Sequence, residues 1–438
     1  MNITDKNKIP EQFFGFVESS PVSYLAVDSI KKLLLDDGFS ELCECDRWTL
    51  SGGGKYFVTR SGSSVIAFIL PENAPHAFSV IASHSDSPCL KIKPSPEIDA
   101  EGHYVKLNTE KYGGMISSTW FDRPLSAAGR LITDDGGIKT INVDLKQDVC
   151  IIPSLAIHLA PREQSRSINP QKELLPLLSG SGGSITALAA KAAGVSKDSV
   201  IGSDLFLYNR DRCIRWGSGG EFFSAPRIDD LECAFSSVTA LLRSKDSGCV
   251  RMCCVFDSEE VGSGTRQGAK STFLSDVISR LGDSLGLSSE DLKRCLASSF
   301  MLSADNGHAV HPNYPEASCP TNRPYLNGGV LIKYNASQKY TTDGISEGIF
   351  KKICRDFEIP YQTYVNRSDI PGGSTLGNLL LQQVSVNMID IGAPQLAMHS
   401  AYETAGSGDL LSLISSMQAF FGTRITMLRD GEFKIEYA

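Results

Sequence analysis

Mostly apolar runs of six to eight residues recur along the chain, at 77–83, 250–256, 299–304 and 384–391. Short apolar runs bounded by turn residues are typical of strands that are buried on both faces. Other stretches carry apolar residues three and four positions apart, which predicts amphipathic helices over 22–37, 231–243, 344–357 and 410–421. Buried strands combined with such helices favour an α/β fold.

The pattern changes between residues 93 and 220. Short β-like pieces alternate there with Gly and Asp turns, and residues 184–193 form one helical patch. Because apolar runs of the first kind lie on both sides, we expect an insertion and not a terminal domain. The prediction is a β-rich domain over 93–222 inside a catalytic domain made of residues 1–92 and 223–438.

Composition narrows the function classes. A chain of 438 residues exceeds the size of most single cores, which agrees with two domains. The net charge of −8 and the lack of a polybasic tract argue against a nucleic-acid partner. No apolar run approaches the length of a membrane span, and the first residues have no apolar signal segment. Twelve irregularly spaced cysteines indicate reduced, mostly buried thiols, so we expect a cytoplasmic protein without a membrane partner.

The clearest candidate chemistry follows the run at 250–256, where Glu259 and Glu260 are adjacent. Neighbouring residues that leave a strand point to opposite sides. One carboxylate can therefore bind a metal while the other reaches the substrate as a proton acceptor. A solvated acidic loop is the alternative for an isolated pair.

Further candidate ligands follow the other runs. His84, Glu260, Asp305 and His399 each come after a predicted strand, and Asp229 opens a predicted helix. Sites in open α/β sheets form beyond the carboxyl ends of the strands. Two histidines, two carboxylates and one shared carboxylate suit a pair of zinc ions about 3.5–4 Å apart. Asp86, two residues after His84, is placed to orient its imidazole. The ordinary alternative for Asp229 is a helix N-cap.

Several motifs resemble the aspartyl aminopeptidase family of dinuclear zinc exopeptidases. They occur in the family's order and span nearly the whole chain, at 83–88, 120–123, 226–229, 257–263, 303–313 and 395–400. The resemblance implies an α/β/α catalytic domain with a mixed sheet and an inserted β-rich dimerisation domain. It also implies a homo-oligomer, a dodecamer built from dimers, that acts on peptides.

The resemblance implies a role for each site residue. His84 and Asp305 would bind one zinc ion, Glu260 and His399 the other, and Asp229 would bridge them. Glu259 would be the general base and Asp86 would orient His84. The residues implied around the substrate are His308, Lys333, Tyr340 and His158, the last reaching a neighbouring subunit's site. On its own, His158 follows an apolar run and has a structural role as its ordinary alternative.

The sequence departs from the family pattern at Asp230, which stands where Asn is common and is expected to add negative charge near the metals. Lys333 favours an acidic first residue in the substrate, with an exposed lysine as the alternative. Manganese or cobalt are possible substitutes for zinc. Two other functions stay open: a co-catalytic dipeptidase or deacylase, and an inactive peptide-binding scaffold.

Overall fold

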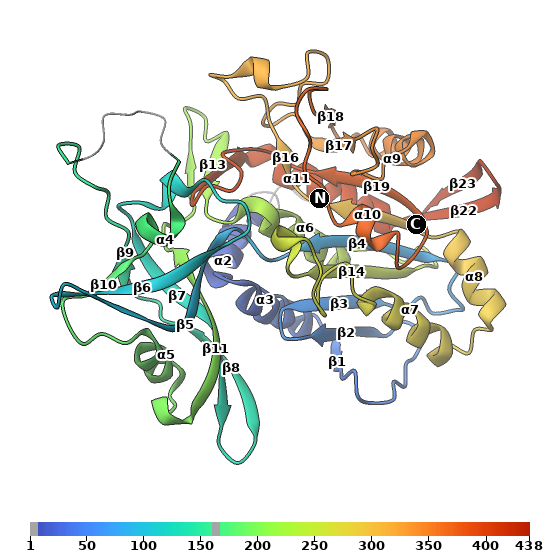
Figure 1. Cartoon of the computed structure of the whole chain (residues 1–438). Coiled ribbons are helices and arrows are strands. Elements are labelled where there is room, and N and C mark those ends of the chain that lie inside the picture. Colours follow the sequence, from blue (N-terminus) through green and yellow to red (C-terminus); the bar gives the residue numbers. More distant parts are fainter. Residues whose placement is uncertain (1–7, 160–166) are drawn as a thin grey trace.

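A nine-stranded mixed sheet forms the centre of the computed structural model, which describes residues 8–159 and 167–438 (Figure 1). Its strands, in spatial order, are β1 (Ser40–Leu42), β2 (Lys55–Arg60), β3 (Ser64–Ile69), β14 (Val250–Phe256), β4 (Phe78–His84), β15 (Phe300–Ala304), β19 (Asn387–Gly392), β17 (Val330–Tyr334) and β18 (Tyr361–Val365). The central four, β14, β4, β15 and β19, run parallel to one another. Their carboxyl ends therefore meet at one edge of the sheet.

Helices cover both faces of this sheet. One face packs on α2 (Ile9–Ser19), α3 (Ser23–Asp36), α6 (Ile228–Leu242), α9 (Gly344–Asp356) and α11 (Ser407–Phe421). The other packs on α7 (Phe273–Ser284), α8 (Ser289–Ala297) and α10 (Gly377–Leu380). Strand β14 illustrates why the runs are continuously apolar. Cys253 and Val255 enter the first core, whereas Met252, Cys254 and Phe256 enter the second.

A second, seven-stranded sheet forms the β-rich part, at the left in Figure 1. Its strands are β5 (Cys89–Ala100), β6 (Tyr104–Tyr112), β7 (Pro124–Asp134), β8 (Ile138–Asp144), β9 (Cys150–Ile151), β10 (Leu177–Ser179) and β11 (Val200–Asn209), joined by the helices α4 (Pro170–Glu173) and α5 (Ile185–Ala193). Strand β7 pairs with β8, β9 and β11, and β11 also pairs with β5, so the sheet closes on itself around a separate core. The boundaries at 92/93 and 222/223 stay a prediction.

A third sheet lies between these two parts. It consists of β12 (Ile214–Trp216), β13 (Phe222–Ala225), β21 (Glu403–Gly406), β20 (Pro394–Leu396) and β16 (Gly307–His308). The remaining elements are the hairpin β22 (Thr423–Arg429) and β23 (Glu432–Tyr437), and four short 3-10 helices at Ser117–Trp120, Lys197–Ser199, Glu259–Val261 and Pro315–Ala317. None of the helices in the described part of the chain combines the length and the apolar character needed to span a bilayer.

The predicted α/β fold is confirmed, and the predicted strand at 250–256 has the same bounds as β14. The prediction omitted α2, α7, α8, the third sheet and the terminal hairpin. Helix α7 did carry a signal, because its buried Phe273, Val277 and Leu281 are four residues apart. The third sheet carries none, since its strands are two to four residues long and come from distant segments.

Candidate metal centre

Nine of the predicted site residues line one pocket at the carboxyl ends of the central strands. The pocket has a volume of about 250 Å³ and is lined by His84, Asp229, Glu259, Glu260, Asp305, His308, Lys333, Tyr340 and His399. Asp86 lies directly behind this wall, in contact with His84. His158 is not among the lining residues. The four parallel strands and the segments that follow them thus bring together side chains more than 300 residues apart.

Asp229 stands at the centre of the group. Its Oδ1 lies 3.6 Å from His84 Nε2, and its Oδ2 lies 3.4 Å from His399 Nε2. Asp229 lies where α6 begins, and its extended backbone (φ −80°, ψ 110°) is one that an N-cap residue adopts. Its carboxylate, however, turns its two oxygens toward the two histidines, and the buried Oδ1 has no hydrogen-bond partner among the described residues, so a helix cap does not account for it. A carboxylate that offers one oxygen to each histidine is arranged to bridge two cations.

The other candidate ligands lie close to this carboxylate. Ligand atoms of His84, Asp229 and Glu260 lie within 4.8 Å of one another, as do those of Asp229, Asp230 and Asp305. His399 Nε2 is also 3.4 Å from Glu260 Oε1. Within the described residues, the buried Asp229 Oδ1 and Glu260 Oε1 have no hydrogen-bond partner. Buried polar atoms normally have partners, and nitrogen and carboxylate oxygen are donors that zinc accepts. The residues therefore fit a zinc centre.

Asp86 connects the histidine side of the centre to the double glutamate. Its Oδ1 lies 3.3 Å from His84 Nδ1. The same carboxylate accepts the backbone N–H groups of Glu259 and Glu260, both at 3.1 Å, and the Tyr112 hydroxyl at 2.8 Å. One side chain thus fixes both a histidine ring and the turn that carries the two glutamates.

The two glutamates do not leave β14 as an extended chain, so the expectation of alternating side chains is wrong. Ser258 adopts a left-handed backbone (φ 67°), and Glu259–Val261 form a 3-10 helix. The turn still sends both carboxylates into the pocket. Burial raises the pKa of Glu259 to about 8, and the charges of Asp305, Asp86 and Asp229 add to this shift against the opposing charge of His84. Such a value suits a group that takes and returns a proton near neutral pH.

Lys333 is buried in the pocket wall, so the exposed-lysine alternative is wrong. Its side chain is 2% exposed, and its Nζ donates to the Asn306 carbonyl at 2.8 Å and lies 3.5 Å from Asp305 Oδ1. Burial acts to lower the pKa of Lys333, but the charges of Asp305, Tyr340 and other nearby groups together outweigh it, so the pKa is raised. The ammonium also lies 5.3 Å from the centre of the Tyr340 ring. The pocket wall therefore keeps a positive charge.

His158 lies on an exposed loop of the β-rich part. The neighbouring apolar side chains are exposed as well, with Leu155 at 57%, Ile157 at 83% and Leu159 at 72%. Monomeric proteins rarely expose contiguous apolar patches larger than about a few hundred Å². The segment has the character of an interface, and the role of His158 in a neighbouring subunit stays a prediction.

Sequence reasoning missed Glu403, which is buried in the third sheet. Its Oε1 accepts the backbone N–H of His399 at 2.7 Å, and its Oε2 accepts that of Asp229 at 3.0 Å. Burial raises the pKa of Glu403 to about 8. The sequence hints at this role only by placing Glu403 four residues after His399. That spacing indicates a contact only if β20 and β21 are known to form a hairpin.

Asp230 lies among the candidate metal ligands, as expected, but its surroundings disfavour the negative charge. It is fully buried, and its Oδ2 accepts the backbone N–H of His84 at 3.2 Å. Burial raises the pKa of Asp230 well above its usual range; the charges of Asp305 and Asp229 add to this, against that of His84. The raised pKa favours the neutral form of Asp230. The side chain therefore adds less negative charge near the proposed metal ions than the sequence led us to expect.

Comparison with known proteins gives a consistent result. The family model described as aminopeptidase I zinc metalloprotease (M18) matches residues 16–421. The probable M18 family aminopeptidase 2 of Clostridium acetobutylicum is 41% identical over 423 residues, covering 94% of this chain and 98% of the relative. The relative of the same name from Pseudomonas savastanoi pv. phaseolicola is 36% identical, covering 93% of this chain and 96% of its own.

Solved structures agree. A chain in the complex of Ape4 and Nbr1 superposes with a TM-score of 0.91 at 35% identity, covering 95% of this chain and 86% of that one. The S. cerevisiae mApe1 dodecamer superposes with a TM-score of 0.84 at 28% identity, covering 95% and 97%.

Proposed function

The chain belongs to the M18 family of zinc aminopeptidases, and from that premise we propose that it removes acidic residues, Asp or Glu, from the N-termini of unblocked peptides. The proposal rests on one observation above all. Asp229 offers one oxygen to His84 and the other to His399, at the end of a pocket whose wall holds the buried cation Lys333.

We assign two zinc ions to each subunit. His84 and Asp305 would hold one, Glu260 and His399 the other, and Asp229 both; manganese or cobalt are possible replacements. When bound, the ions supply a water of lowered pKa and polarise the scissile carbonyl group. The two unpartnered buried oxygens of Asp229 and Glu260 support this assignment.

Glu259 is the general base in this proposal. It takes a proton from the attacking water and returns it to the leaving amine. Asp86 keeps the Glu259 backbone in place through its hydrogen bond to the N–H group. His308, at the pocket rim, and His158 of a neighbouring subunit would stabilise the oxyanion. The free α-amine would lie among the carboxylates, which accounts for exopeptidase action on unblocked peptides.

The preference for acidic residues depends on Lys333 and Tyr340. A buried ammonium interacts more strongly with a substrate carboxylate than an exposed one does, because the surrounding dielectric is lower. Neutral first residues offer no charge to this group, so we expect them to be poorer substrates.

We also propose a homo-oligomer, a dodecamer built from dimers, with the β-rich part as the dimerisation domain. The mApe1 structure of S. cerevisiae is a dodecamer. The exposed Leu155, Ile157 and Leu159 beside His158 support an interface at that loop. A cytoplasmic location stays a prediction.

A substrate panel tests this function. Purified protein with zinc is given Asp-, Glu-, Leu- and N-acetyl-Asp peptides, and kcat/KM is measured for each. We expect release of free Asp and Glu from the unblocked peptides only. A clear preference for Leu contradicts the acidic assignment, cleavage of the acetylated peptide favours the deacylase function, and no turnover favours the scaffold.

A variant pair links the preference to Lys333. Lys333→Met removes the charge at nearly constant length, and we expect the ratio of kcat/KM for Asp over Leu peptides to fall by about tenfold or more, the effect of about 1.4 kcal/mol. Lys339→Met is the matched control, since Lys339 bonds the Gly372 carbonyl and is not part of the pocket lining. An unchanged ratio in Lys333→Met rules out this residue as the specificity determinant.

A further inference from the structure

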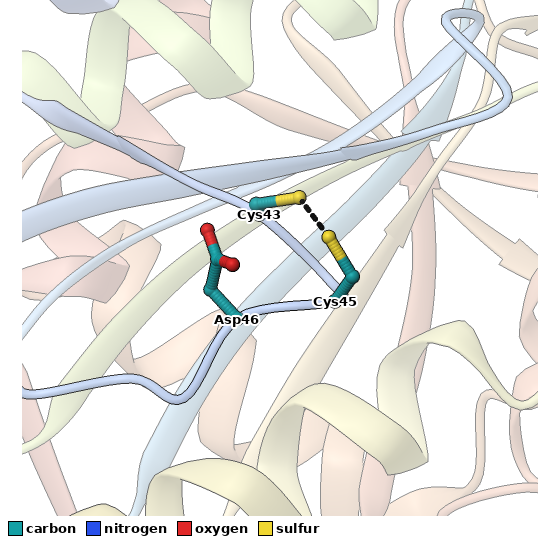
Figure 2. Close-up of side chains that lie close together, drawn as sticks. All are labelled: Cys43, Cys45 and Asp46. Atoms are coloured by element: carbon teal, nitrogen blue, oxygen red, sulfur yellow. Dashed lines mark hydrogen bonds between the residues drawn. The ribbon is translucent and has the colours of Figure 1, made fainter.

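Two exposed thiols touch in the loop that follows β1. Most of the twelve cysteines are buried or half-buried, whereas Cys43 and Cys45 are exposed. Their sulfur atoms lie 2.9 Å apart and point toward each other (Figure 2). The pair is not part of the candidate metal centre, because neither cysteine lines that pocket.

The backbone around this pair is held in place. The Asp46 N–H donates to the Cys43 carbonyl at 3.3 Å and closes a tight turn. The same carbonyl accepts the Trp48 indole N–H at 2.9 Å. Arg280 donates to the Glu44 carbonyl at 2.8 Å and stacks on the Trp48 ring, 3.7 Å from its centre. The contacts of Trp48 and Arg280 therefore hold the backbone of this turn, while its two thiols are exposed to solvent.

The geometry favours bond formation between the sulfurs over metal binding. The Asp46 carboxylate joins the thiols in a cluster whose ligand atoms lie within 4.8 Å. A structural zinc site uses four protein ligands, and two thiolates at about 2.3 Å from one zinc ion would be about 3.8 Å apart. This turn supplies three ligands, all exposed, and zinc would have to separate sulfurs already in contact. A disulfide of about 2.04 Å instead draws them closer on a fixed backbone.

We propose that Cys43 and Cys45 are a redox-active dithiol that reacts as one unit with low-molecular-weight disulfides such as oxidised glutathione. The Cys43 thiolate attacks one glutathione sulfur, forms a mixed disulfide and releases the other glutathione as a thiol. Cys45 then gives up its proton and attacks Cys43 Sγ, which forms the Cys43–Cys45 bond and releases the second glutathione. Two electrons pass from the two cysteines to the glutathione disulfide, which is reduced to two thiols.

The surroundings of Cys45 agree with the proposed order of attack. Its hydrogen bond with Cys43 raises the pKa of Cys45, and the charges of Cys43 and Asp46 raise it further. This direction agrees with Cys45 acting second, and the contact of its sulfur with Cys43 Sγ places it for that step. Because its sulfur already touches Cys43, the mixed disulfide is short-lived.

Mass spectrometry of the intact enzyme after treatment with oxidised glutathione tests the proposal. Thiols are blocked at timed intervals, and trypsin releases the peptide 33–47, which holds these two cysteines and no others. In the natural chain we expect this peptide to lose two hydrogen atoms without accumulating bound glutathione, and dithiothreitol to restore it. In Cys45→Ser we expect the glutathione adduct to accumulate at Cys43, at least tenfold above its level in the natural chain.

Cys319 is the internal comparison. Hydrogen bonds from the backbone and side chains of Thr321 and Asn322 lower the pKa of Cys319 to about 6. A reactive thiol of this kind, without an adjacent thiol, is expected to keep its glutathione adduct. The proposal is overturned if peptide 33–47 of the natural chain keeps both thiols while Cys319 reacts, or if it retains the adduct as Cys45→Ser does. It is also overturned if equimolar zinc added to the enzyme already loaded at its catalytic site blocks oxidation of this peptide, since that result identifies a metal site.

Discussion

Two carboxylates, Asp229 inside the pocket and Asp86 behind it, organise the centre at the scale of single residues. Asp229 faces both histidines, and Asp86 contacts His84 as well as the backbone of the double glutamate. Glu403 completes the arrangement by accepting the backbone N–H groups of Asp229 and His399. Asp86 and Glu403 thus hold the proposed ligands in place without needing to touch a metal themselves, as is common in metal sites.

If Glu259 transfers protons and does not bind metal, a substitution there should change turnover but not zinc content. Glu259→Gln keeps the size of the side chain but removes its ability to accept a proton. We expect kcat to fall by about 10²–10⁴-fold, the usual contribution of general-base catalysis, with the zinc content unchanged. Turnover of an Asp peptide and zinc per subunit are measured on the same preparation.

Glu290→Gln is the control, because Glu290 lies exposed in the first turn of α8. Full activity in Glu259→Gln means that another residue is the general base. A loss of zinc together with activity means that Glu259 acts as a ligand.

The sequence was enough to predict the positions of site residues that directly follow a single strand. It was not enough for site residues whose positions depend on pairing between distant segments. His84 is the last residue of β4 and Asp305 follows β15 directly, so their positions could be predicted. Glu403 depends on the β20–β21 hairpin and on β13, which joins from almost 180 residues earlier. The inward turn at Ser258 depends on one left-handed residue that no periodic pattern reveals.

At the scale of elements, the site depends on four parallel strands buried on both faces. Apolar runs identified these strands because both faces must be apolar where helices cover both sides. Apolar residues three and four positions apart identified α3, α6, α9 and α11, because these helices must present apolar side chains to the face of the sheet on which they pack. Neither pattern can order the strands, and the sheet places β14 from the middle of the chain between β3 and β4.

The loop over residues 152–159 carries the element-scale prediction. If His158 completes the site of a neighbouring subunit, His158→Ala loses about 10²-fold or more in kcat, the effect of removing one oxyanion donor. It should still assemble and bind zinc, because the apolar side chains of the loop and the metal ligands are unchanged. Activity, light-scattering mass and zinc content check this.

His103→Ala is the matched control, an exposed histidine in the turn between β5 and β6 of the same β-rich part. Retention of full activity by His158→Ala removes the shared-site arrangement from the account. Loss of assembly would instead assign His158 to the interface.

At the scale of the whole molecule, the third sheet ties the β-rich part to the catalytic part. Strand β12 lies near the end of the predicted insertion and β13 begins at its boundary, and β13 pairs with β21, which begins four residues after His399. The composition and the change of pattern at 93–220 predicted a β-rich insertion. They did not predict its closure, because β7 pairs with β11 across about 75 residues, and such non-local pairing leaves no local signal.

We propose that peptide hydrolysis by this M18 aminopeptidase needs two zinc ions joined by Asp229. The most direct measurement is a zinc titration of the chelator-treated enzyme, with bound zinc per subunit and turnover of an unblocked Asp peptide recorded at each step. We expect activity to reach its plateau only as the second equivalent binds, and Asp229→Ala to reach no comparable plateau at any zinc concentration. Full activity at one equivalent, or in Asp229→Ala, would contradict it.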